Sequence, residues 1–114
     1  MDMSEWTSQA RRGILEYSIL LLISKKSRYG YELVTLLDQW EPLAVTEGTL
    51  YPLLRRLLKE KYIDSQWKES EAGPPRKYYS LTEAGHRLME AMSLEWSKLS
   101  TAMNQIVMYR GEKS

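Results

Sequence analysis

Residues 46–61 place the strongest constraint on how this chain folds. Their leucines, at positions 50, 53, 54, 57 and 58, recur every three or four residues, which puts them on one face of a helix. The other face carries Tyr51, Arg55 and Lys59, with Arg56 beside them. One face is suited to packing against a protein core, and the other, aromatic and cationic, is suited to meeting DNA.

Length and composition indicate one folded domain. With 114 residues the chain can build one hydrophobic core but not two. It contains no cysteine, which excludes a disulfide scaffold and a cysteine-based zinc finger. The longest apolar run, residues 19–23, is too short to span a bilayer, and the first residues lack the layout of a signal peptide. We therefore expect a cytoplasmic protein with no membrane partner.

The charge of the whole chain says little about its partners. The formal net charge is only +1, so a case for nucleic-acid binding depends on where the charges lie. Residues 46–61 contain four lysines and arginines, at positions 55, 56, 59 and 61, against glutamates at 47 and 60. The excess is therefore local to the predicted helix.

Two helices are predicted before this one. Residues 4–26 form the first, with a stripe of Ile14, Leu15, Ser18, Leu21 and Leu22. Because Tyr17, Ile19, Leu20 and Ile23 make it apolar off that stripe too, we expect its own domain and a partner chain to cover it.

The second helix begins near Gly30 and is expected to bury Leu33, Leu36, Leu37 and Trp40 before Pro42 stops it. Thr46 is predicted to cap the third helix, its hydroxyl accepting a hydrogen bond from the backbone of residue 48 or 49. Pro52 should bend or loosen the start of that helix. Two helices, a short connector and a basic third helix form a helix-turn-helix pattern.

A β-hairpin is predicted after the third helix. Residues 62–69 alternate as a strand, residues 70–75 are turn formers, and residues 76–81 return. A hairpin in this place is a wing, and Arg76 and Lys77 beside its tip suit the minor groove of DNA. The alternative is an ordinary edge strand whose charges prevent aggregation.

A long last helix is predicted from Glu83 to about residue 110. Its apolar residues are spaced alternately by three and four and form a heptad seam: Met89, Met92, Trp96, Leu99, Met103 and Ile106. Since a small domain cannot cover so long a seam, we expect a dimer interface that also includes Trp6. The alternative is an intramolecular hairpin with residues 4–26.

The predicted fold is mainly α with a small β-hairpin: a winged helix-turn-helix followed by a long C-terminal dimerisation helix. We expect residues 1–81 to form the DNA-binding domain and residues 82–114 the dimerisation helix.

Three stretches in this order, YGYEL, GTLYPLLRRL and RKYYSLTEAG, strongly resemble the PadR family of bacterial transcriptional regulators. The likeness extends from about residue 11 to residue 96, and the single last helix is similar to the short subfamily. The resemblance implies a winged helix-turn-helix homodimer, joined through its first and last helices, that represses transcription from a palindromic operator.

The resemblance also implies functional residues. The start of the third helix and the wing should contact DNA, and the start of the second helix should hold a phosphate: Tyr29, Gly30, Tyr31, Thr46, Glu47, Thr49, Leu50, Tyr51, Arg55, Gly73, Arg76 and Lys77. Trp96 matches a tryptophan that stacks aromatic compounds in the multidrug-responsive members. An effector pocket for a small aromatic or phenolic ligand is expected from Arg12, Leu15, Glu16, Trp96 and Ser100. The alternative role of Trp96 is a core residue of the heptad seam.

Two other classes of function can be compared with the sequence. A winged helix that binds proteins and not DNA would suit the near-neutral charge, but not the clustered cations. An enzyme is not expected, because His86 is the only histidine and no nucleophile–base pair or metal-ligand set accompanies it. No cofactor and no metal is expected.

Overall fold

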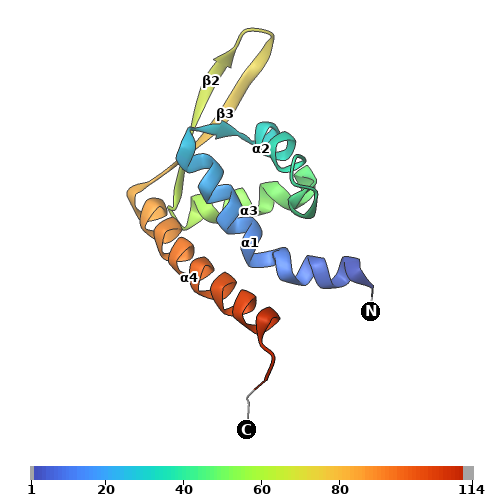
Figure 1. Cartoon of the computed structure of the whole chain (residues 1–114). Helices are drawn as coiled ribbons and strands as arrows, with labels where there is room; N and C mark the ends of the chain where they lie inside the picture. Colours follow the sequence, from blue (N-terminus) through green and yellow to red (C-terminus); the bar gives the residue numbers. More distant parts are fainter. Residues whose placement is uncertain (1, 112–114) are drawn as a thin grey trace.

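The computed structural model describes residues 2–111 as a winged helix-turn-helix body with two projecting parts (Figure 1). The β2–β3 hairpin stands out on one side, and α4 runs away on the other, giving extents of 68 × 33 × 22 Å. The predicted fold class is confirmed. The elements, in chain order, are α1 (Met3–Lys25), β1 (Arg28–Tyr29), α2 (Gly30–Leu37), η1 (Glu41–Leu43), α3 (Glu47–Lys59), β2 (Ile63–Ser70), β3 (Gly73–Leu81) and α4 (Glu83–Met108).

The core lies between α1, α2, α3 and the base of the sheet. The residues that α1 contributes are Leu15, Ile19, Leu20 and Ile23. Of the predicted stripe, Leu15 is buried and Leu22 packs partly buried against the core, whereas Ile14, Ser18 and Leu21 are partly buried and outside that cluster. When a helix is apolar on nearly every side, its hydrophobic periodicity does not identify which face packs against the core.

The second helix ends earlier than predicted. It stops at Leu37, and a turn and the 3₁₀ helix η1 follow, with Pro42 inside η1. Leu33 and Leu37 are fully buried, but Trp40 is 50% exposed, so its assignment to the buried face was wrong. Once the helix has ended, the 3.6-residue period no longer directs residue 40 towards the core.

The third helix packs as its leucine pattern predicts. Leu50, Leu54 and Leu57 are fully buried, and the helix accommodates Pro52 at an exposed position. Thr46 is the N-cap residue, as predicted, but the predicted bond of its side chain was wrong. The Thr46 hydroxyl makes no capping bond but donates to Oγ1 of Thr49 at 3.4 Å, while the Thr46 carbonyl accepts from the backbone of Thr49 and Leu50.

The sheet has the order β1–β3–β2 and is antiparallel throughout. The strand β1 was not predicted from the sequence: its residues, Arg28 and Tyr29, pair with Tyr79 and Tyr78. β3 begins at Gly73, three residues before the predicted start, so the turn at the tip is shorter than expected. A two-residue strand is too short for any alternation to reveal it.

The start of α4 is joined closely to the end of α3. The Thr82 hydroxyl donates to the carbonyl of Lys61 at 2.7 Å and accepts from the backbone N–H of Gly85 at 3.0 Å. Gly85 lies so close to the carbonyl of Tyr62 that any Cβ there would overlap with it. Lys61 itself has a φ of 65° and ends α3 in the left-handed conformation.

Candidate nucleic-acid interface

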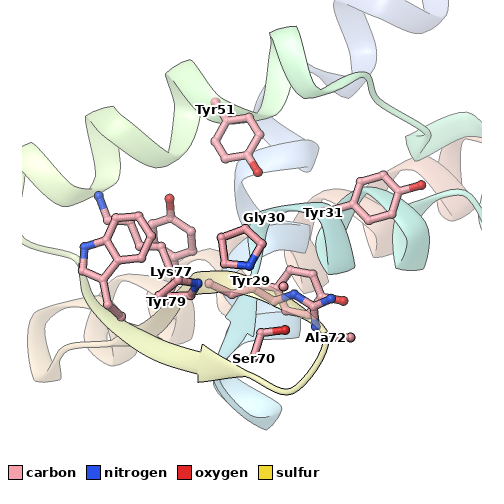
Figure 2. Close-up of a pocket in the computed structure, with 13 residues that line it drawn as sticks. Tyr29, Gly30, Tyr31, Tyr51, Ser70, Ala72, Lys77 and Tyr79 are labelled. Atoms are coloured by element: carbon pink, nitrogen blue, oxygen red, sulfur yellow. The ribbon is translucent and has the colours of Figure 1, made fainter.

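A cleft of about 630 Å³ lies between the start of α2, the exposed face of α3 and the wing. Its lining is mainly aromatic and cationic (Figure 2). It brings together seven of the residues predicted to contact DNA, from three separate segments of the chain: Tyr29, Gly30, Tyr31, Tyr51, Gly73, Arg76 and Lys77.

Tyr51 closes the cleft on the side of α3. Its ring points from the helix towards the start of α2, as Figure 2 shows. It lies so close to Gly30 that a Cβ at that position would overlap with the phenol. Glycine is thus required here for close packing, and the contact fixes the start of α2 against α3. Burial raises the pKa of the Tyr51 phenol, and the nearby Glu47 carboxylate acts in the same direction.

The cations of the wing lie over aromatic rings. The Arg76 guanidinium is 4.5 Å from the ring centroid of Tyr29, which in turn makes an edge-to-face contact with Tyr78 at 5.4 Å. The Lys77 ammonium is 6.0 Å from the ring centroids of both Trp67 and Tyr79. Because successive strand residues point to opposite faces, Arg76 and Lys77 extend from opposite faces of the hairpin.

Arg55 extends the cationic character of the cleft along α3. Burial raises the pKa of the Tyr79 phenol, with Tyr51 acting in the same direction and the Arg55 guanidinium acting against both. Arg55 therefore lies near Tyr79, although it does not line the cleft. Its side chain is exposed and free to reach a phosphate.

The remaining predicted residues belong to the start of α3. Thr46, Glu47 and Thr49 are exposed there, outside the cleft. Leu50 is fully buried in the core, so its side chain cannot contact DNA and that prediction is corrected. The leucine spacing places it on the packing face of α3, whereas the contact with DNA was implied by the family resemblance alone.

Sequence reasoning missed Trp67, Pro74, Pro75 and Tyr79, which also line the cleft. Trp67 is paired with Lys77 across the hairpin and is 67% exposed. Alternation predicted that it shares a face with the buried Ile63. It is exposed nevertheless, because the outer half of the hairpin extends beyond the body of the protein (Figure 1).

A second hollow, a groove of about 430 Å³, lies between α1 and α4. We call it the α1–α4 groove. It is almost wholly apolar, and the hydroxyl groups of Tyr17 and Ser93 are hydrogen-bonded near it at 2.8 Å. Its lining comes from four residues of α1 and five of α4: Ala10, Gly13, Ile14, Tyr17, Ala91, Met92, Glu95, Trp96 and Leu99.

Of the predicted effector residues, only Trp96 lines this groove. Leu15 belongs to the core, and Glu16 is paired with Arg56 of α3 at 2.6 Å. Arg12 is exposed elsewhere on α1, and the Ser100 hydroxyl donates to the backbone carbonyl of Ser97. The groove and the predicted effector set thus share Trp96 of α4, but the α1 residues of the predicted set do not line the groove.

The outer part of the heptad seam is uncovered. Trp96, Leu99, Met103 and Ile106 are between 44% and 65% exposed, whereas Met89 and Met92 pack against the core. Trp6 is also exposed, on the part of α1 that diverges from α4 (Figure 1).

Among residues 2–111, no group of three histidine, cysteine, aspartate or glutamate side chains is placed to hold a metal ion. Within the same residues, no helix combines the length and the apolar character needed to cross a membrane.

Comparison with known proteins gives consistent results. A family model described as the transcriptional regulator PadR-like family matches residues 19–91. An uncharacterized protein of Lysinibacillus sphaericus is 33% identical over 90 residues, which cover 77% of this chain and 83% of that protein.

Solved structures extend the likeness to the whole fold. A PadR-like transcriptional regulator from Bacillus cereus has 42% identity and a TM-score of 0.81, with 91% of this chain and 99% of that chain covered. PadR of Bacillus subtilis, solved in complex with operator DNA, shares the fold at 23% identity and a TM-score of 0.64, covering 69% of this chain and 46% of that one. The chain therefore belongs to the PadR-like family of transcriptional regulators, which are not enzymes.

Proposed function

We propose that this protein binds double-stranded DNA as a homodimer and represses transcription from a palindromic operator. The exposed start of α3 enters the major groove, and the wing lies along the neighbouring minor groove. The observation that carries the proposal is the cleft, because it joins the start of α2, α3 and the wing into one concave aromatic and cationic surface.

Charge placement supports this assignment. Arg55, Arg76 and Lys77 lie in or beside the cleft of a chain whose net charge is only +1. Such cations supply affinity through phosphate contacts, while side chains at the start of α3 supply sequence discrimination. The Bacillus subtilis relative that shares this fold was solved with operator DNA bound.

The dimer is proposed to form through α1 and α4. The uncovered seam from Trp96 to Ile106 has the spacing of a coiled-coil interface, and a second copy would cover it. A two-fold dimer also presents two α3 helices, which suits half-sites separated by one helical turn, roughly 34 Å.

The test begins with selection of binding sites from random-sequence duplexes by the wild-type protein. We expect enrichment of one palindrome, whose affinity is then measured by fluorescence anisotropy at two salt concentrations. Affinity should fall steeply with salt because counterions are released from the phosphates. A dimer, confirmed by analytical ultracentrifugation, that enriches no duplex would instead favour a protein-interaction module.

A flat aromatic effector is proposed to bind the α1–α4 groove beside Trp96 and to release the DNA. The groove is apolar, with Glu95 as its acidic lining residue, so a cationic aromatic dye is a suitable probe. We expect the dye to quench Trp96 fluorescence and to weaken binding to the selected duplex. Trp96→Leu should abolish both effects, while Trp40→Leu, a change outside the groove, should leave the release intact.

A further inference from the structure

The two sides of α1 have different partners. One side contributes Ala10, Gly13, Ile14 and Tyr17 to the α1–α4 groove. Arg11 and Glu16 project elsewhere from the same helix turns and contact the α3 region of the body. Because α1 forms one wall of the groove, a displacement of α1 there would act on the segments of the body that these two side chains contact, which lie in α3 and just before it.

Arg11 holds the connector that leads into α3. Its guanidinium donates to the backbone carbonyl of Pro42 at 3.2 Å and to that of Ala44 at 3.1 Å. Ala44 lies two residues before Thr46, the N-cap residue of α3. Both bonds come from the same terminal nitrogen, Nη1, whose two N–H groups can serve two carbonyls at once.

Glu16 holds the second half of α3. Its carboxylate accepts from the Arg56 guanidinium at 2.6 Å, and the two side chains are 20% and 51% exposed. Arg56 is one of the four cations that the sequence concentrates around α3, but its guanidinium is directed at α1 and engaged by a carboxylate. An exposed pair of this kind contributes little to overall stability.

The other wall of the groove is fixed to the same helix. Thr82, the residue before α4, donates to the carbonyl of Lys61 immediately after α3. Both helices that form the groove are therefore bonded to α3 or to the segments that flank it.

We propose that Arg11 and Glu16 are positioning residues that set the orientation of α3 against α1. In the dimer they thereby set the separation of the two α3 helices, which is how occupation of the α1–α4 groove changes DNA binding. The inference rests on the proposed dimeric DNA-binding function and assigns to the Glu16–Arg56 pair a role in geometry and not in phosphate contact.

The direction in which Glu16→Gln changes the affinity for DNA distinguishes a positioning role of the Glu16–Arg56 pair from a phosphate contact by Arg56. If Arg56 contacted phosphate, Glu16→Gln would release it and leave affinity for the selected duplex unchanged or higher. Positioning predicts that Glu16→Gln weakens binding by about threefold to thirtyfold. It also predicts a weaker spacing preference, which is the ratio of the affinity for this duplex to that for a duplex with a single base pair inserted at its centre. The charge-reversed double variant, Glu16→Arg with Arg56→Glu, should restore both quantities.

Arg11 has a matched control in its neighbour. Arg11→Gln and Arg12→Gln remove the same charge from the same helix, but Arg12 is exposed. We expect Arg11→Gln to reduce the spacing preference, Arg11→Lys to retain part of it, and Arg12→Gln to retain all of it. Equal behaviour of the Arg11 and Arg12 variants, or wild-type spacing preference in Glu16→Gln, would overturn the inference.

A measurement without DNA keeps this inference separate from the proposed function. Because the chain has no cysteine, Lys59→Cys on the exposed side of α3 accepts a single spin label per protomer. Double electron–electron resonance should give one narrow label separation in the wild-type background and a shifted or broadened one with Glu16→Gln. If the wild-type protein enriched no duplex, only the proposed DNA binding would be contradicted. Unchanged label separations in the variants, or the absence of a dipolar signal, would contradict the positioning role.

Discussion

Helices α3 and α4 carry the same apolar spacing but differ in what covers it. The leucines of α3 at positions 50, 54 and 57 are fully buried by the protein's own core. The seam of α4 from Trp96 to Ile106 is about half exposed. A spacing of three and four residues thus predicts that a face will be covered, but not whether the cover belongs to the same chain.

The largest difference in stability between α3 and α4 is expected when a leucine of each helix is replaced by alanine. Leu54→Ala should lower the free energy of unfolding by about 2–5 kcal/mol, because it leaves a cavity in a closed core. Leu99→Ala should cost much less in dilute protein and more as concentration rises, since the proposed cover of this residue is a second chain. Urea denaturation at two protein concentrations measures both, and a concentration-independent effect of Leu99→Ala would break the comparison.

Two glycines extend the comparison between covered and uncovered faces, with smaller expected effects on stability. Gly85→Ala forces a Cβ onto the Tyr62 carbonyl and should cost about 1–3 kcal/mol, as overpacking does. Gly13→Ala meets no atom within 4 Å in the single chain and should raise helix stability by up to about 1 kcal/mol. Thermal unfolding measures both changes. If Gly13→Ala destabilises only at high concentration, the partner chain packs against that position.

The exposed tryptophans extend the comparison to the wing. Trp67→Ala should weaken binding to the selected duplex by about tenfold, through loss of apolar contact with the DNA, and leave the slope against salt unchanged. Lys77→Ala should reduce that slope by about one, because one phosphate contact is lost. Salt titrations monitored by anisotropy separate the two. Trp40→Ala is the control, and an equal loss of affinity in this variant would contradict a specific contact between Trp67 and DNA.

The smallest effect expected is on alkaline stability. Burial raises the pKa of the Tyr79 phenol above its unfolded value, so the folded state holds this proton more tightly. Its contribution is therefore complete below the unfolded pKa near 10 and is lost as the pH rises through the folded value. Tyr79→Phe should flatten the decline of the melting temperature above that pH. An unchanged decline would assign the alkaline sensitivity to other groups.

Local sequence patterns revealed the four α-helices and the hairpin but not the strand β1 or the long-range pairings. The leucines of α3, the alternation of the hairpin and the heptad seam follow from spacing alone, and the order of the three motifs indicated the family. The partner of Arg56 lies 40 residues away, and β1 exists only because β3 passes beside it. The contacts between α1 and α4 likewise depended on which face of α1 turned inward, and no local period specifies that face because residues 14–23 are apolar on nearly every side.

The contact between Arg76 and Tyr29 has a consequence for the entropy of association. A long arginine side chain in solution samples many rotamers, and DNA binding normally removes that freedom at a cost of about 0.5–1.5 kcal/mol. In this protein the ring of Tyr29 already restricts the guanidinium, at 4.5 Å, before any partner arrives. Part of the ordering of the wing is thus complete in the free state, and the aromatic residue that provides it belongs to the short strand β1.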